Sequence, residues 1–224
     1  MKTTLLDFPE HIACTVFAKG CNLRCPFCHN ASLVISRESH GDTLSEGDFF
    51  SFLEKRRSIL DGVVVSGGEP LLQDDIFEFL KKIREYGYQI KLDTNGTFPD
   101  KLTRIIEADL VDYVAMDIKN SPDKYFLTTG AEVLSQVSRS VEILMNSGIE
   151  YEFRTTTVEQ LHNADDIIAI GKWISGAKRY FIQRFENSGD ILGKADFSAP
   201  SDDSLREFLL SVKTYVPSAE LRGI

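Results

Sequence analysis

Short apolar runs alternate with amphipathic stretches along nearly the whole chain. Runs such as 62–68 are continuous and rich in valine, which is typical of a buried strand. The stretch 71–87 instead spaces its apolar residues three and four apart and ends at Gly87, which indicates a helix with a glycine after its last turn. The predicted strands are 11–18, 62–68, 88–96, 111–119, 149–158 and 178–185, and the predicted helices are 44–60, 71–87, 100–108, 132–148, 164–175 and 201–215.

This alternation gives six β-then-α units, which predict an α/β fold with parallel strands and right-handed crossovers. The pattern alone allows either an open doubly wound sheet or a curved barrel, complete or partial. The length of 224 residues fits one domain of the barrel kind, and no linker or low-complexity tract divides residues 1–224.

Composition narrows the possible functions. The net charge of −9 argues against general nucleic-acid binding, which needs clustered lysine and arginine. No apolar run approaches the roughly 18 residues that a membrane span needs, so no membrane association is expected. The first residues lack the apolar core of a signal peptide, so we expect a cytoplasmic protein with reduced thiols.

Unusual polar clusters follow the predicted strands. They are "SGGEP" (66–70), "DTNG" (93–96), "MDIK" (116–119) and "RTTT" (154–157), and a cysteine-rich segment follows the first strand. Because barrels and open parallel sheets both carry function at the C-terminal ends of their strands, these clusters predict one composite site.

The segment "KGCNLRCPFCHN" (19–30), here called the cysteine loop, carries three of the four cysteines of the chain, Cys21, Cys25 and Cys28. Thiolates select zinc, copper(I) or iron–sulfur clusters. A zinc site needs a fourth ligand, and neighbouring residues such as Cys28 and His29 rarely bind one tetrahedral ion. Cys14 lies in mid-strand and is expected in the core. A [4Fe–4S] cluster on three thiolates would instead leave one iron open to a small molecule.

The spacing C-x₃-C-x₂-C after the first strand of a repeated β/α chain resembles the signature of the radical S-adenosylmethionine (SAM) superfamily. In that superfamily three cysteines hold a [4Fe–4S] cluster, and the amino and carboxylate groups of SAM bind its open iron. Electron transfer from the reduced cluster cleaves SAM and makes a 5′-deoxyadenosyl radical. The resemblance therefore implies a partial TIM-type (β/α)₆ barrel and a cluster on Cys21, Cys25 and Cys28.

Further segments extend the resemblance. "SGGEP" is similar to the superfamily's GGE element, which receives the ammonium group of SAM, and this implies cofactor contacts for Gly67, Gly68 and Glu69. Phe27 fills the aromatic position common before the last cysteine, and Asn30 after "CH" matches the glycyl-radical-enzyme activating enzymes.

In those activating enzymes the segments similar to "LDTNG" and "MDIK" contact the cofactor, and an acidic group there helps to hold a monovalent cation. The resemblance implies cofactor contacts for Asp93, Thr94, Asp117 and Lys119, although a cross-strand ion pair would also account for the last two. Arg154 stands alone as a cation in a strand. It needs an anionic partner, either the cofactor carboxylate or an aspartate at a strand end.

The chain resembles the activating enzymes over nearly its whole length, and its opening is most similar to the anaerobic ribonucleoside-triphosphate reductase activating proteins. Such proteins take a hydrogen from a glycine of a partner glycyl-radical enzyme, and flavodoxin or ferredoxin is their usual reductant. Two alternatives stay open: an enzyme like 7-carboxy-7-deazaguanine synthase, and a non-catalytic iron–sulfur or zinc module. The remaining histidines, His11, His40 and His162, are expected to be structural or solvent-facing.

Overall fold

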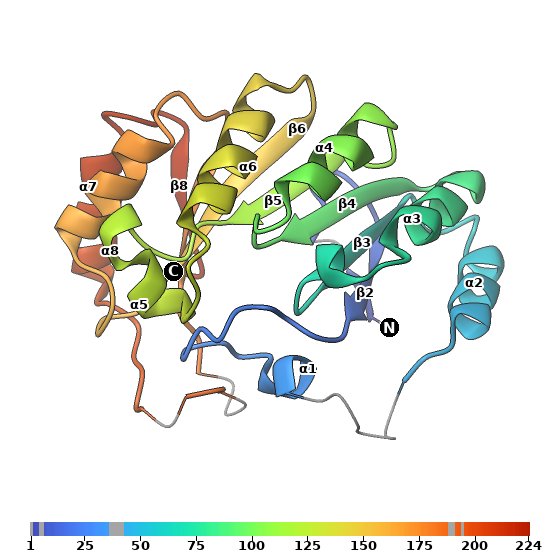
Figure 1. The fold of residues 1–224 in the computed structure, drawn as a ribbon, viewed down its shortest axis with the longest axis horizontal. Helices are drawn as coiled ribbons and strands as arrows, with labels where there is room; N and C mark the ends of the chain where they lie inside the picture. Colours follow the sequence, from blue (N-terminus) through green and yellow to red (C-terminus); the bar gives the residue numbers. More distant parts are fainter. Residues whose placement is uncertain (1, 5–6, 36–42, 188–190, 194) are drawn as a thin grey trace.

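The computed structural model describes residues 2–4, 7–35, 43–187, 191–193 and 195–224. Its strands form one sheet in the order β1 to β8, in which β1 runs antiparallel to β2 and all later neighbours run parallel (Figure 1). The strands are β1 (Lys2–Thr4), β2 (Ala13–Ala18), β3 (Gly62–Gly67), β4 (Gln89–Thr94), β5 (Tyr113–Asp117), β6 (Glu150–Thr157), β7 (Tyr180–Arg184) and β8 (Ala219–Arg222). The α-helices are α1 (Ala31–Ile35), α2 (Glu46–Lys55), α3 (Ile76–Glu85), α4 (Pro99–Glu107), α5 (Tyr125–Thr129), α6 (Leu134–Asn146), α7 (Ala164–Trp173) and α8 (Asp202–Val212), and the 3₁₀ helices are η1 (Pro70–Leu72) and η2 (Pro122–Lys124).

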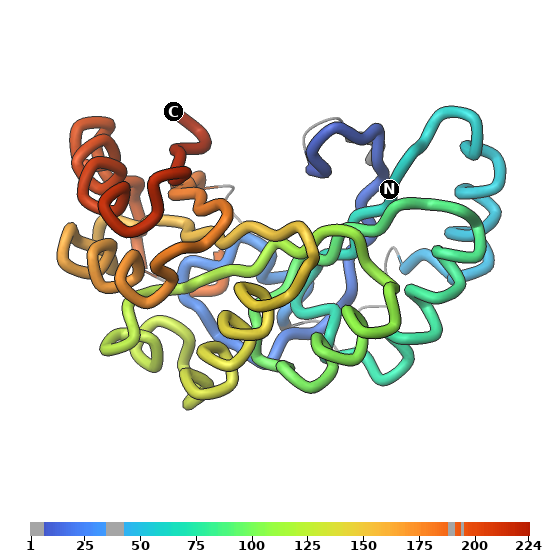
Figure 2. The backbone as a smooth tube through the Cα atoms, turned by 90° about the horizontal axis from the view of Figure 1, so that it is seen from above, coloured from blue at the N-terminus to red at the C-terminus, as the bar shows by residue number. Residues whose placement is uncertain are grey.

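The strictly sequential strand order decides between the two predicted architectures. A doubly wound sheet reverses direction at a switch point, whereas successive right-handed crossovers without reversal place the helices on one face and curve the sheet. Figure 2 shows the resulting curved arrangement, with the first and last parts of the chain standing apart. The fold is a partial TIM-type barrel, as the sequence predicts.

The two faces of the sheet have different chemistry. The outward face carries aliphatic and aromatic residues such as Val65, Leu92 and Met116, which pack with the helices into the main core. The inward face is apolar only in part, around Val64 and Ala115. Because side chains alternate along a strand, the inward face receives the polar positions that the sequence places between apolar ones.

All six predicted strands and all six predicted long helices are present, with ends that differ by a few residues. The helix predicted over 44–60 ends at Lys55, and its first turn is capped by Ser45, whose Oγ accepts from Asp48 N at 3.1 Å. Gly87 has φ +86° directly after the last turn of α3, as expected of a left-handed glycine. Cys14 is fully buried in the main core, which confirms its prediction.

The sheet has two strands more than the sequence predicts, because β1 and β8 are too short, at three and four residues, to show a pattern. Within the described residues no helix is long and apolar enough to span a membrane.

Candidate active site

A cavity of about 370 Å³ lies at the C-terminal ends of β2 to β7. A cavity of this size is typical of small-molecule sites in α/β folds. It is lined by twelve of the thirteen residues predicted from the sequence: Cys21, Cys25, Phe27, Cys28, Asn30, Gly67, Gly68, Asp93, Thr94, Asp117, Lys119 and Arg154. The structure thus brings these residues together around one cavity at the strand ends.

The cysteine loop is tied down by backbone hydrogen bonds from distant segments. Gly68 N donates to O of Ala18, the residue before the loop, at 3.0 Å, and Glu69 N donates to Gly20 O within it at 2.9 Å. Arg24 N donates to Thr129 O at the end of α5, at 2.9 Å. Leu192 N and Gly193 N donate to the carbonyls of Cys28 and Pro26 at 3.0 and 2.7 Å. The loop is therefore held in one shape by the ends of β3, α5 and the segment 191–193.

Gly67 and Gly68 let the cysteine loop lie directly against the end of β3. A Cβ on Gly67, which has φ +132°, would meet Ala18 O at 2.3 Å, and a Cβ on Gly68 would meet Gly20 O at 2.1 Å. The sequence suggests that these glycines make room for a ligand. The structure gives a further reason, which is that the backbone of the loop occupies the space of both side chains.

The three thiols that line the cavity suit a metal cluster. Burial raises the pKa of Cys25 to about 12 and also raises the pKa of Cys21, so neither is an anion without a metal. The described residues hold no group of three or more His, Cys, Asp or Glu side chains placed to hold a single metal ion. A [4Fe–4S] cluster takes each thiolate at a separate iron.

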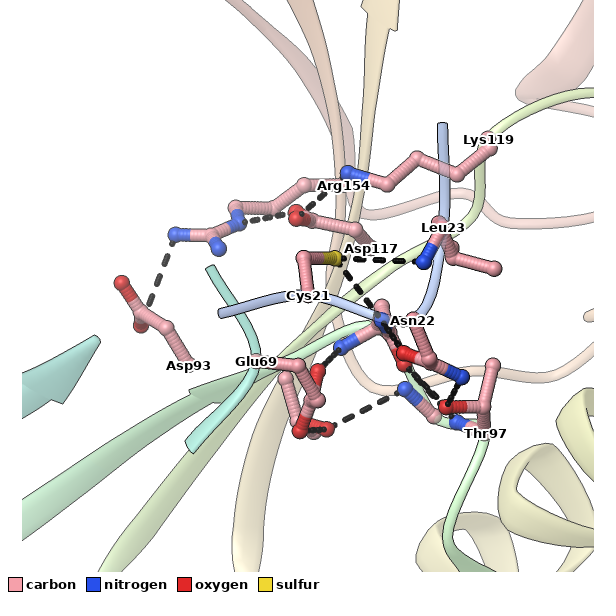
Figure 3. A network of polar contacts seen from close by, with 12 residues as sticks. Cys21, Asn22, Leu23, Glu69, Asp93, Thr97, Asp117, Lys119 and Arg154 are labelled. Carbon is pink, nitrogen blue, oxygen red and sulfur yellow. Dashed lines mark hydrogen bonds and ion pairs between the residues drawn. The ribbon is translucent and has the colours of Figure 1, made fainter. Parts of the chain in front are cut away.

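A row of alternating charges crosses the inward face beside the thiols (Figure 3). Arg154 Nε lies 3.0 Å from Asp117 Oδ1, and Lys119 Nζ lies 2.9 Å from Asp117 Oδ2. Arg154 also reaches Asp93, with Nη1 3.6 Å from Oδ1, and Lys91 Nζ binds the same oxygen at 2.8 Å. Asp117 is level with Arg154 on the adjacent strand, so the register of β5 and β6 makes the central contact.

These contacts decide the ionisation of the row. Although burial favours the neutral form of Asp117, Arg154 and Lys119 hold the pKa of that carboxyl below its usual range. Asp93 behaves alike, since Arg154 and Lys91 outweigh burial and lower its pKa. Asp93 and Asp117 are therefore ionised near neutral pH. Of the basic side chains in the row, Lys119 and Arg154 line the cavity, where their positive charge suits an anionic ligand group.

Comparison with known proteins identifies the family. Residues 15–173 match the sequence pattern of the Radical SAM superfamily. The chain belongs to the radical SAM superfamily. It is 32% identical over 227 residues to the "Putative glycyl-radical enzyme activating enzyme MJ1227" of Methanocaldococcus jannaschii, covering 98% of this chain and 92% of that protein. It is 36% identical over 127 residues to the pyruvate formate-lyase-activating enzyme of Listeria monocytogenes, covering 51% of this chain but only 50% of the relative.

The fold likeness extends to solved structures. The crystal structure of Streptococcus suis SuiB bound to S-adenosylmethionine aligns with a TM-score of 0.74 and 15% identity, covering 94% of this chain and 50% of that one. The protein is thus a radical SAM enzyme, and the superfamily's cofactors are a [4Fe–4S] cluster and SAM. The residues present fit both, because three thiols and the two cations Lys119 and Arg154 line one cavity.

The residues of this radical SAM enzyme do not fit the monovalent cation that the resemblance implies. Asp117 already has two cationic partners within 3.0 Å, and Asp93 has the buried ammonium of Lys91 at 2.8 Å. The protein's own side chains balance both carboxylates. Arg154 contacts an aspartate at a strand end, one of its two predicted partners, and its contact with the cofactor carboxylate stays a prediction.

Glu69 differs from the other predicted site residues. It is fully buried, and it is not among the residues that line the cavity in the described part of the chain. Its carboxylate accepts from Leu71 N at 3.0 Å, Thr94 Oγ1 at 2.8 Å and Asn95 N at 2.6 Å. Its contact with the cofactor stays a prediction, while the structure gives it a clear role in joining the end of β3 to the turn after β4.

The structure describes two of the three remaining histidines, His11 and His162, and neither lines the cavity. His162 is buried, and its ring contacts Lys119 O at 3.0 Å and Val158 N at 3.1 Å, so it supports the backbone beside a cavity residue. His11 lies outside the cavity and stacks on Phe8. His40 lies outside the described residues.

Eight further residues line the cavity without having been predicted as site residues: Phe17, Leu23, His29 (considered above only as a zinc ligand), Val34, Ser66, Asn95, Thr156 and Gln183. Most of them belong to the motifs already quoted or to strand ends. Gln183 pairs with Thr156 on neighbouring strands, so strand alternation from Arg154 could have found both. Val34 comes from α1, a helix too short to predict.

Proposed function

We propose that this radical SAM enzyme activates a glycyl-radical enzyme by removing one hydrogen atom from a glycine of that partner. The observation that carries the proposal is the likeness to MJ1227, whose name states this activity and which aligns over nearly the full length of both chains. The alignment with the Listeria monocytogenes pyruvate formate-lyase-activating enzyme spans only about half of each chain, but it supports the same class of reaction.

When bound, the cluster and SAM supply the carbon radical that accepts the hydrogen atom. In this proposal the chain's own residues bind and orient. Cys21, Cys25 and Cys28 hold three irons. Lys119 and Arg154 offer positive charge to the carboxylate of SAM, and Asp117 fixes the direction of both cations.

The open barrel supports a protein substrate. Each edge strand of the described sheet, β1 and β8, pairs with one neighbour only, so the sheet does not close on itself. Phe17, at the end of β2, lines the cavity and is 52% exposed. An exposed aromatic at the rim of a cavity is a suitable contact for an incoming protein loop.

For the partner we propose an anaerobic ribonucleotide reductase, on the likeness of the opening segment to its activating proteins. The test is anaerobic mixing of reconstituted enzyme, SAM and reductant with candidate glycyl-radical enzymes, followed by electron paramagnetic resonance. A carbon-centred doublet with the reductase, absent with the Cys25→Ala enzyme and absent when the partner's glycine is replaced by alanine, supports the proposal. A doublet with a different glycyl-radical enzyme reassigns the partner, and cleavage of SAM without a doublet in any of them rejects the activity.

Flavodoxin or ferredoxin is proposed as the reductant. Each would replace dithionite in the same mixture, and the rate of 5′-deoxyadenosine formation would be measured. A rate at or below that of a mixture without any reductant would reject that donor.

A further inference from the structure

Asn95 connects the turn after β4 to the first cysteine of the cysteine loop. Its Nδ2 lies 3.0 Å from Asn22 Oδ1 and 3.8 Å from Cys21 Sγ. Figure 3 shows Cys21, Asn22 and Thr97 close together in a polar network. Asn95 is only 4% exposed. The amide is thus directed at a cysteine sulfur and not at solvent.

The orientation of this amide is fixed by its other end. Asn95 Oδ1 accepts from Thr97 N at 3.0 Å and from Thr97 Oγ1 at 2.7 Å. Asn22 Nδ2 donates to Thr97 Oγ1 at 2.8 Å, which closes a ring of three side chains. A flipped amide would aim its N–H groups at the backbone N–H of Thr97, so the nitrogen must face the sulfur.

The turn that carries Asn95 is rigid as well. Asn95 N donates to the buried carboxylate of Glu69 at 2.6 Å. Gly96 has φ +75°, its O accepts from Ser140 Oγ at 2.7 Å, and a Cβ there would meet Met116 Cε at 2.2 Å. The amide is therefore held in place before any cofactor binds.

Cys21 receives a second donor from its own loop, since Leu23 N lies 3.4 Å from Sγ. Hydrogen bonds to the sulfurs of an iron–sulfur cluster stabilise its reduced form, which carries more negative charge, and so raise its reduction potential. A backbone donor such as Leu23 N is part of the cysteine loop itself, and a side-chain substitution does not remove it. A side-chain donor supplied by another strand end can be removed by one substitution.

We propose that Asn95 is a positioning residue that sets the reduction potential of the cluster through Cys21. The motifs "GGE" and "DTNG" then share a task beyond contact with SAM, because Glu69 fixes the turn and the turn fixes the amide. The inference rests on the superfamily's cluster and not on the proposed protein partner.

The test is a potentiometric titration of the reconstituted cluster without SAM or partner, monitored by electron paramagnetic resonance. Asn95→Ala removes the donor without adding charge and should lower the midpoint. A tenfold shift in the redox equilibrium corresponds to about 59 mV for one electron, and a shift of this order is expected. The matched control is Asn146→Ala, which removes an exposed asparagine amide on α6 that donates to Glu142 O at 2.8 Å.

A midpoint of Asn95→Ala equal to that of Asn146→Ala overturns the inference. If Asn95→Ala takes up no cluster, Asn95→Ser decides, since it keeps a small polar residue in the turn but carries no amide N–H. A midpoint of Asn95→Ser below the wild type supports the inference, and an unchanged one rejects it. Loss of activity toward every partner would reject the proposed function and leave this result intact.

Discussion

Gly68→Ala tests whether the cysteine loop needs direct contact with the end of β3. The new Cβ would lie 2.1 Å from Gly20 O, against 3.4 Å for the shortest ordinary contact, so one of the two backbones must move by about 1.3 Å. The same Cβ would lie 3.2 Å from the Cβ of Cys21. Movement of the loop also weakens the hydrogen bond from Glu69 N to Gly20 O.

Because backbone atoms have little freedom to yield, we expect a loss of roughly 2–3 kcal/mol in the free energy of unfolding. In a chain of this size that lowers the melting temperature by roughly 4–12 °C. The displaced Cys21 should also lower the iron bound per chain after reconstitution. Thermal unfolding of the metal-free protein and an iron assay measure the two effects separately.

Gly148→Ala is the matched control, because a Cβ there has nothing within 4 Å and the backbone is not in the left-handed region. We expect normal iron content and a stability equal to the wild type or higher by about 0.4–1 kcal/mol. A Gly68→Ala enzyme that melts with the control and binds as much iron would refute the packing argument.

Three further outcomes are expected. Cys25→Ala should lose both the cluster and SAM cleavage, whereas Cys14→Ala should keep both. Iron and sulfide content measure the cluster, and 5′-deoxyadenosine formation measures cleavage. Equal losses in the two variants would contradict the assignment of Cys25 as a cluster ligand. Lys119→Met should weaken SAM binding in equilibrium dialysis by about tenfold or more, since a charged hydrogen bond contributes about 1.5–3 kcal/mol. The control Lys178→Met, which removes a surface lysine 2.9 Å from Glu150, should leave SAM binding unchanged. Equal affinities of the two variants for SAM would contradict the expected contact. Burial raises the pKa of Glu69 from 4.5 to about 7, so between these values the unfolded chain has released a proton that the folded chain keeps, and stability falls as pH rises. Glu69→Gln should remove this part of the pH dependence, as seen by urea unfolding at about pH 5 and about pH 7.5; identical slopes in variant and wild type would show that Glu69 does not titrate there.

The sequence predicts the position of the site because parallel strands place their C-terminal ends at one edge. Asp93, Asp117 and Arg154 could be expected to meet once their strands were assigned, and they do. What the pattern leaves open is which partner each group takes. For Arg154 two partners were expected, and the strand register places one of them, Asp117, beside it, while contact with the cofactor carboxylate stays a prediction.

Glu69 shows a limit of sequence reasoning in physical terms. Its motif indicates a ligand contact, but its donors Thr94 and Asn95 come from another strand end, and only the folded turn brings them within 2.8 Å. Likewise, no pattern in the sequence reveals that Gly67 and Gly68 face the backbone of residues 18–20. Such contacts depend on packing between segments about 25 to 50 residues apart.

The open sheet has a consequence for solubility. Its free edges belong to β1 and β8, which are the shortest of the described strands. A barrel left open exposes backbone N–H and C=O groups that could pair with a strand of another chain. Edge strands of three or four residues offer only a few such groups, so this pairing is weak. Lengthening β8 by a few β-branched residues would turn a harmless rim into a template for intermolecular sheet growth.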